Sequence, residues 1–142
     1  MSEGDLLHRF LFENLAVHGH LVRLDASWRA AIDHHDYPRP VSDILGEALA
    51  ASVLLAGSLK FKGRLSLQIE GPGPVRLLLA QCTHRHAIRG VARHRPVPVQ
   101  SAGATGLFGT GQLAVTIEQD GRGDHYQGLV AIEQPQLSGC LE

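Results

Sequence analysis

The sequence predicts an α+β fold in which antiparallel β-hairpins pack around a buried central helix in a single domain. Two pairs of alternating, strand-like stretches, within residues 64–81 and 112–132, each flank a turn. Between the N-terminal region and the first pair, residues 42–56 carry an apolar stripe at helical spacing. The chain contains neither internal repeats nor the alternating strand–helix rhythm that indicates a parallel sheet.

Length and composition agree with one globular domain. The chain has 142 residues, of which 44% are hydrophobic and 19% charged. A chain of this length buries roughly two-thirds of the surface that its unfolded form exposes. Lys and Arg number 13 against 14 Asp and Glu, a balance that favours neither disorder nor a nucleic-acid partner.

The chain carries no recognisable targeting or membrane signal. Residues 1–5 are polar and acidic, unlike the basic and apolar regions of a secretory signal. The longest apolar run, residues 48–57, is about half of the roughly 20 residues that cross a bilayer. We therefore expect a cytoplasmic location and no membrane partner.

The elements follow in order along the chain. Residues 5–24 contain aromatic and branched residues that predict one or two strands, and residues 26–34 predict a short helix that the Tyr37–Pro40 segment ends. Ser42 is the expected N-cap of the central helix. Because Ala50, Ala51, Leu54 and Leu55 make its other side apolar too, the helix is expected to contact more than one layer.

The second half of the chain predicts mainly strands. Residues 64–70 and 75–81 form a hairpin around Gly71–Pro74, and residues 86–92 supply a third strand. Residues 93–111 are rich in Pro, Ser and Gly and predict a long loop. Residues 112–118 and 126–132 form the second hairpin, and a helical pattern starts near Leu137.

Two groups of residues could form a chemical site, the cysteine and histidines near residue 82 and a glycine-rich loop, and the sequence pattern favours neither. On an extended strand Cys82, His84 and His86 would share one face, but no neighbouring residue supplies the fourth ligand that tetrahedral zinc needs. The only other cysteine is Cys140, so we expect no metal site and no disulfide framework in this chain. We expect Cys82 to be a buried, small apolar side chain rather than a catalytic nucleophile. Nothing in the sequence requires an enzyme.

The glycine-rich loop 103–111 supports an alternative function, a small-molecule or nucleotide-binding enzyme domain. Residues 109–114 match a loose dinucleotide-binding pattern. That pattern requires a strand before it and a helix after it, whereas here a loop precedes and a strand follows. A flexible or tightly turning loop is therefore favoured.

Short phrases along the whole chain resemble one chaperone family. They include Arg9-Phe10-Leu11-Phe12-Glu13, Leu21-Val22-Arg23-Leu24-Asp25, Leu59-Lys60-Phe61-Lys62-Gly63, Gly71-Pro72-Gly73-Pro74, Arg89-Gly90-Val91-Ala92-Arg93 and Tyr126-Gln127-Gly128. In this order they are similar to the N-terminal core of the redox-regulated heat-shock holdase family of thirty-three kilodaltons, the thirty-three-kilodalton chaperonin.

The resemblance implies an ATP-independent holdase that binds unfolding proteins and prevents their aggregation. It further implies activation by oxidation through a C-terminal site of four cysteine thiolates and zinc. Residues 1–142 would then be the client-binding core, with the linker and the zinc domain outside this chain, so no cofactor is expected here. Unfolded client proteins are the expected partners, and a homodimer formed by exchange of elements is also implied.

Client binding by an apolar surface needs no catalytic residue. Leu107 and Phe108 are two large apolar residues inside the predicted glycine-rich loop, where they are poorly placed for a core. We therefore predict that these two side chains contact clients, with loop anchoring as the alternative.

Overall fold

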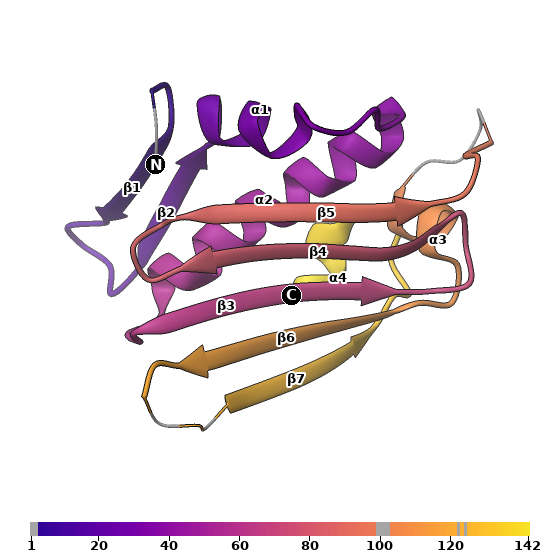
Figure 1. Ribbon diagram of the computed structural model, residues 1–142. Coiled ribbons are helices and arrows are strands. Elements are labelled where there is room, and N and C mark those ends of the chain that lie inside the picture. Colours follow the sequence, from indigo (N-terminus) through magenta and orange to yellow (C-terminus); the bar gives the residue numbers. More distant parts are fainter. Residues whose placement is uncertain (1–2, 99–102, 122, 124) are drawn as a thin grey trace.

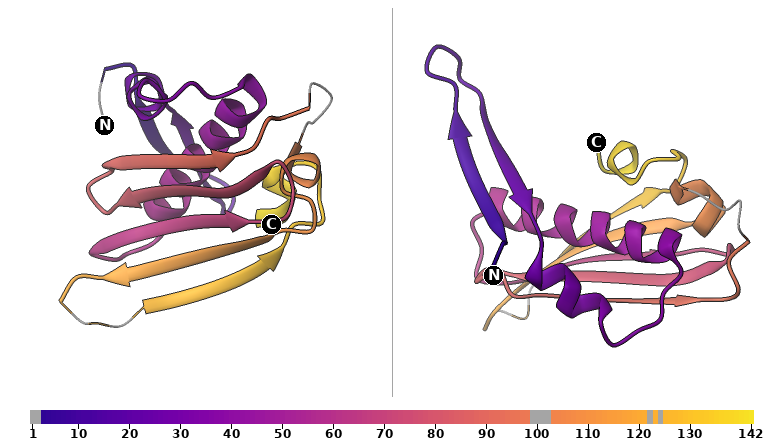
Figure 2. Two further views of the ribbon diagram at one scale, coloured as in Figure 1. Left: turned by 45° about the vertical axis from the view of Figure 1, so that its right-hand side comes forward. Right: turned by 90° about the horizontal axis from the view of Figure 1, so that it is seen from above.

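The computed structural model describes residues 3–98, 103–121, 123 and 125–142. Within these ranges the chain forms a two-stranded ribbon, a five-stranded antiparallel sheet and four helices (Figure 1). The predicted α+β class is confirmed. Figure 2 shows that the longest helix lies along one face of the sheet, so the body has two layers.

The sheet is built from the two predicted hairpins and the third strand. In spatial order it contains β5 (Ile88–His94), β4 (Val75–Thr83), β3 (Gly63–Glu70), β6 (Gln112–Gln119) and β7 (His125–Ala131). Both hairpins are confirmed, with β3 at the centre pairing with β4 and β6. Because side chains alternate along a strand, Leu65, Leu67 and Ile69 all point toward the helix layer and are fully buried.

The helix α2 (Arg39–Ser58) supplies the other half of the core. Its buried side chains follow the predicted stripe: Ile44, Leu45, Ala48, Leu49, Ser52, Val53 and Ala56. Ser52 donates its hydroxyl hydrogen to the carbonyl oxygen of Leu49 at 2.7 Å, so its burial leaves the hydroxyl satisfied.

The expectation that Ser42 is the N-cap of α2 is wrong. The helix begins at Arg39 after Pro38, with Pro40 in its first turn, where a missing N–H costs nothing. Ser42 is thus inside the helix and bonds back to the carbonyl oxygen of Arg39. The helix contacts both the five-stranded sheet and the two-stranded ribbon, as expected, and the side that carries Ala50, Ala51, Leu54 and Leu55 is partly buried.

By length and composition α2 could cross a membrane, although the apolar run 48–57 within it is too short to do so alone. The core helix of a soluble protein passes the same test, and 44% of the most apolar window of α2 is buried inside the fold. Its packing on the sheet accounts for the apolar residues of its buried face.

The predicted long loop 93–111 is also wrong in part. Strand β5 continues to His94, and α3 (Gly103–Phe108) forms within the segment; residues 99–102 lie outside the described residues. Gly109 ends α3 with φ 66°, a left-handed conformation common after helices, and its N–H donates to the carbonyl oxygen of Thr105. The chain closes with α4 (Leu137–Leu141), where a helical pattern was predicted.

The turn between β3 and β4 packs tightly on α3. A Cβ atom on Gly71 would lie 2.1 Å from the backbone oxygen of Phe108, and one on Gly73 would lie 2.5 Å from that of Leu107. These are backbone atoms that cannot move aside easily. The turn between the strands therefore fixes the position of α3.

We predict that Gly71→Ala lowers the free energy of unfolding by about 2–3 kcal/mol, as expected for overpacking. The matched control is Gly106→Ala, because Gly106 lies in α3 and a Cβ atom added to it would meet no atom within 4 Å. Alanine there should raise stability by about 0.5–1 kcal/mol. Urea denaturation followed by circular dichroism measures both. Equal effects of the two substitutions would contradict the packing described for Gly71.

Candidate functional site

The predicted client-binding residues Leu107 and Phe108 lie in the hydrophobic core. Leu107 is 1% exposed and Phe108 is 0% exposed. The premise that they are poorly placed for a core is wrong, because α3 turns both side chains inward. Contact with clients stays a prediction for these residues, and in this conformation neither presents surface for it.

The glycines of segment 103–111 allow its backbone to approach neighbouring backbone segments closely. A Cβ atom on Gly111 would lie 2.7 Å from the carbonyl oxygen of Glu70, and Gly103 packs equally closely on Pro135. Strand β6 follows the segment, so no helix N-terminus meets a phosphate there. This geometry gives the nucleotide-binding alternative no support.

The residues around Cys82 do not form a metal site. Strand β4 ends at Thr83, and His84 and His86 lie in the turn that follows. The Nδ1 atom of His84 accepts a hydrogen bond from the N–H of Gly63 at 2.9 Å. Among the described residues no group of three His, Cys, Asp or Glu side chains could hold a metal ion.

Cys82 itself is fully buried, as predicted, and burial raises the pKa of its thiol from 9.0 to about 11. Because the folded-state pKa is the higher one, the thiol's contribution to stability is present below pH 9 and is lost as the pH rises toward 11. Cys140 is 5% exposed.

We predict that the free energy of unfolding of the native chain falls more steeply between pH 9 and 11 than that of Cys82→Ala. Urea denaturation at several pH values measures the difference, which isolates Cys82 from other groups that titrate in this range. At about pH 7, well below the raised pKa, a thiol reagent should modify Cys82 no faster than the fold opens. The same pH dependence of the free energy of unfolding in both proteins, or rapid modification of Cys82 at about pH 7, would contradict a buried thiol.

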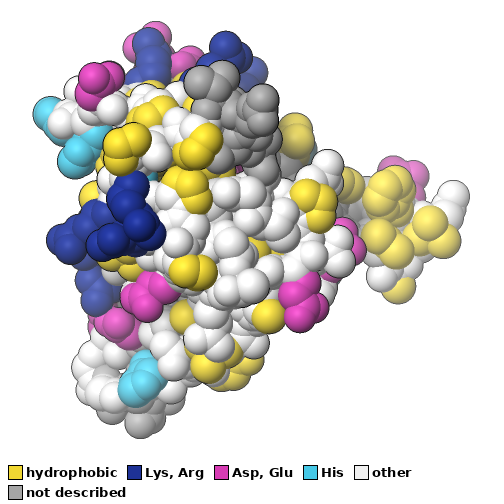
Figure 3. Space-filling view, turned by 90° about the vertical axis from the view of Figure 1, so that its right-hand side faces the viewer, with side chains coloured by type: hydrophobic (Ala, Val, Ile, Leu, Met, Phe, Trp, Pro, Cys, Tyr) yellow, Lys and Arg dark blue, Asp and Glu magenta, His cyan; other side chains and the backbone are white. Residues whose placement is uncertain are grey.

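The largest concentration of exposed apolar side chains lies on the ribbon formed by β1 (Leu6–Leu11) and β2 (His18–Arg23), hereafter called the arm (residues 6–23). Leu7 and Val22 pair across its base and pack against the core. Toward the tip, the arm extends beyond the body (Figures 2 and 3). Its exposed large apolar side chains are Leu6, Phe10, Leu11, Phe12, Leu15, Val17 and Leu21.

The tip of the arm is ordered by its own contacts. The ring of Phe10 lies over Gly19, its cross-strand partner, where an added Cβ would approach the ring to 2.3 Å. Phe10 and Phe12 stack edge to face with ring centres 5.8 Å apart. The N–H of Phe12 donates to the carbonyl oxygen of Val17 at 3.1 Å and closes the hairpin. These contacts leave Leu11 and Leu15 at 69% and 63% exposed.

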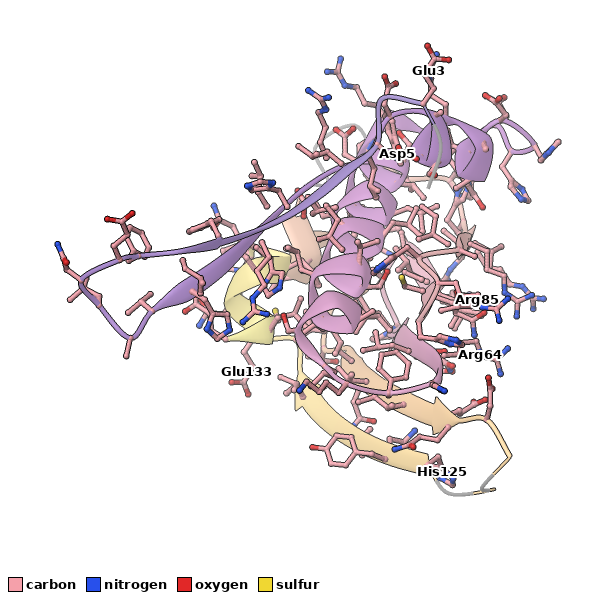
Figure 4. The ribbon with its side chains drawn as sticks, turned by 90° about the vertical axis from the view of Figure 1, so that its left-hand side faces the viewer. Glu3, Asp5, Arg64, Arg85, His125 and Glu133 are labelled. Carbon is pink, nitrogen blue, oxygen red and sulfur yellow. The ribbon has the colours of Figure 1, made fainter. Side chains whose placement is uncertain are left out.

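The base of the arm is tied to the body by polar contacts. Asp5, labelled in Figure 4, lies where the arm meets α1 (Ala26–Ile32). Its Oδ1 accepts hydrogen bonds from the N–H groups of Asp25 at 2.7 Å and Ser27 at 3.3 Å. The carboxylate thus satisfies donors at the start of α1 that no helical partner reaches. The arm therefore has a fixed base and an exposed apolar tip.

An apolar groove of about 670 Å³ lies between α2 and α4. Its walls include the outer side of α2, which was expected to be buried: Ala50, Ala51, Leu54 and Leu55. Leu137 and Leu141 line it from α4. A third apolar surface lies at β7, where Tyr126 and Leu129 are exposed.

One run of apolar residues in the sequence indicates the exposed surface of the arm, which the prediction of strands does not by itself reveal. Phe10, Leu11 and Phe12 are consecutive, and successive strand residues point to opposite faces. A two-stranded ribbon packed on one side can bury only one of those faces. Such a run therefore indicates an exposed apolar surface, which neither Leu107 nor Phe108 provides.

A family model described as "Hsp33 protein" matches residues 5–142. The chain belongs to the Hsp33 family. Among curated relatives, the "33 kDa chaperonin" of Nitrosococcus oceani is 48% identical over 143 residues, and that of Cronobacter sakazakii is 42% identical over 142 residues. Each alignment covers 100% of this chain and 48% of the relative. The chain thus spans about half the length of these Hsp33 relatives.

The Hsp33 assignment agrees with the fold. A crystal structure of the 33 kDa chaperonin from Thermotoga maritima, a heat shock protein 33 homolog, superimposes with a TM-score of 0.82 at 24% identity. The superposition covers 95% of this chain and 48% of that one. Membership of the Hsp33 family confirms the family that the sequence resembles.

Proposed function

We propose that this chain is the client-binding core of an ATP-independent holdase, which binds unfolding proteins and prevents their aggregation. The observation that carries the proposal is the arm, whose apolar tip is ordered and exposed. Monomeric soluble proteins rarely expose contiguous apolar patches larger than a few hundred Å², and larger patches mark interaction sites.

The proposed activity follows from the hydrophobic effect. An unfolding client exposes apolar segments that would otherwise associate with those of other clients. Contact with the arm removes apolar area from water at roughly 25 cal/mol per Å² and thus competes with self-association. Neither nucleotide nor catalytic residue is needed, in keeping with a non-enzymatic role.

Oxidative activation would reside in the half of the relatives that this chain does not span. There a zinc site of four cysteine thiolates would form disulfides on oxidation and release its zinc. The two cysteines of this chain are buried, Cys82 at 0% and Cys140 at 5% exposure, which fits a core that does not itself sense peroxide. This chain would therefore act independently of the redox state.

The remaining proposals concern assembly and location. Unfolded or misfolded proteins are the proposed clients, in the cytoplasm, with neither nucleic acid nor membrane as a partner. The full-length protein would form a homodimer, and exchange of elements between subunits is one route to it.

Light scattering of a thermally unfolding client tests the proposal. The chain at equimolar ratio should suppress the scattering equally with and without ATP, and equally before and after peroxide treatment. Scattering unchanged by the chain would contradict the holdase activity of this core. Dependence on peroxide would contradict the placement of the switch outside it.

A further inference from the structure

Strand β7 is an open edge of the five-stranded sheet. It pairs with β6 on one side, and it is the last strand in the spatial order. Six of its seven residues are exposed, and the seventh, Gly128, is partly buried. Residues 126–131 contain neither a charged residue nor a proline, although natural proteins use both to block edge strands from pairing.

The other edges in the described part of the chain are protected. At the opposite edge of the sheet, the N–H of Ala92 in β5 donates to the hydroxyl oxygen of Tyr37 at 3.0 Å, and α1 packs on the same strand. Strand β5 also carries Arg89 and Arg93. Each strand of the arm contains an arginine, Arg9 in β1 and Arg23 in β2. Among the described strands, only β7 combines an unpaired backbone with an uncharged sequence.

The backbone groups that β7 offers can be assigned by alternation. The N–H of Ile132, directly after β7, donates to the carbonyl oxygen of Gly111 at 2.9 Å, on the side of β6. Since hydrogen-bonding direction alternates along a strand, Val130, Gly128 and Tyr126 also face β6. The N–H and C=O groups of the intervening residues, Gln127, Leu129 and Ala131, are therefore directed away from the sheet.

Apolar side chains flank this edge on both faces. Tyr126 and Val130 pair with the inward-facing Ile117 and Leu113 of β6, so they lie on the α2 side of the sheet. Leu129 pairs with Ala114 on the opposite side. Tyr126 is 64% and Leu129 58% exposed. A strand added here would find backbone partners along the edge and apolar contacts on both faces.

We propose that β7 binds an extended apolar segment of an unfolded client by strand addition. This rests on the proposed function and deepens it by naming the conformation of client that the chain recognises. Backbone pairing does not depend on sequence, so such an edge accepts many clients, and the absence of charge favours apolar ones. An edge of about six residues spans about 20 Å. One strand pair of that length falls short of the roughly 1,200 Å² that stable complexes bury, which favours a transient segment over a second copy of this chain.

The test uses a fluorescein-labelled peptide of seven alternating valine and threonine residues, whose binding is followed by fluorescence anisotropy. Gln127→Pro removes one outward N–H, a change that edge strands tolerate. The matched control Gln127→Ala keeps this N–H and, like the proline variant, loses the side-chain bond to Thr116. Proline should weaken peptide binding at least about tenfold relative to alanine, with melting temperatures that agree within a few degrees.

A second pair of variants decides the matter if Gln127→Pro fails to fold. Leu129→Lys places a charge on the edge and should weaken binding to the same extent, whereas Leu129→Ala should weaken it much less. Equal binding within each pair, or no binding by the native chain, would overturn strand addition. A native dimer that Gln127→Pro converts to a monomer in light scattering would also overturn it, because a second copy would then occupy the edge.

These outcomes are separable from failure of the proposed function. Suppression of client aggregation that survives in Gln127→Pro would leave the holdase activity standing and remove β7 from it. Loss of suppression in the native chain would instead contradict the holdase proposal itself.

Discussion

Replacement of Leu11, Leu15 and Val17 by serine is expected to raise the concentration of this chain needed to suppress client aggregation by more than about tenfold. The three side chains are 69%, 63% and 50% exposed at the tip of the arm. Burial of one large apolar side chain contributes about 1.5–3 kcal/mol. Loss of even part of that from three residues exceeds the roughly 1.4 kcal/mol that corresponds to tenfold.

The stability of this triple variant should change little, because exposed substitutions away from special features shift the free energy of unfolding by about 0.5 kcal/mol or less each. The control is Arg76→Ser, which changes an exposed side chain on β4 outside the arm. It should leave suppression unchanged. If the triple variant suppressed aggregation as well as the native chain, the arm would not be the client-binding surface.

Phe108→Ala is expected to lower the free energy of unfolding by about 3–5 kcal/mol, the cost of removing a buried aromatic ring and leaving a cavity. Phe108 is 0% exposed and lies where α3 meets the turn between β3 and β4. For a domain of this size the melting temperature should fall by about 10–20 °C. Thermal unfolding followed by circular dichroism measures the shift.

The control for this prediction is Leu129→Ala, an apolar side chain that is 58% exposed and should change stability by less than about 0.5 kcal/mol. A fall in client binding by Phe108→Ala at temperatures where it remains folded would revive the prediction that this residue contacts clients. Normal stability of Phe108→Ala would contradict its place in the core.

The parts of the fold that the sequence predicts well are those with strong local periodicity. The alternation of Leu65, Leu67 and Ile69 places their strand in the sheet, and the spacing from Ile44 to Ala56 defines the buried face of α2. In both cases the residues that repeat are the residues that become buried. The periodicity of these residues therefore predicts which side chains are buried.

Other features depend on contacts between distant segments and leave no local pattern. The start of α2 at Arg39 is different, because it is local: the carbonyl oxygen of Pro38 accepts bonds from the N–H groups of Val41 and Ser42, and a proline in the first turn is a helix-start signal. Helix α3 forms in a glycine-rich segment because it packs against the turn at Gly71. Tertiary packing there overrides weak intrinsic helix propensity.

The candidate site is the least predictable part of the molecule. The prediction for Leu107 and Phe108 assumes a loop that cannot bury them, whereas the structure places them on a helix that does. The arm is predicted as strands, but its distance from the core depends on how β1 and β2 meet α2. Exposure of an apolar residue is a property of the whole fold, so composition alone could not identify the surface.

A photo-crosslinking amino acid placed at single positions of the chain tests the client-binding arm most directly. One variant carries it at Leu15, at the tip of the arm, and another at Arg76, which is exposed on β4. In the presence of an unfolding client we expect a covalent adduct from position 15 and little or none from position 76. Equal adducts from the two positions, or none from position 15, would contradict client binding by the arm.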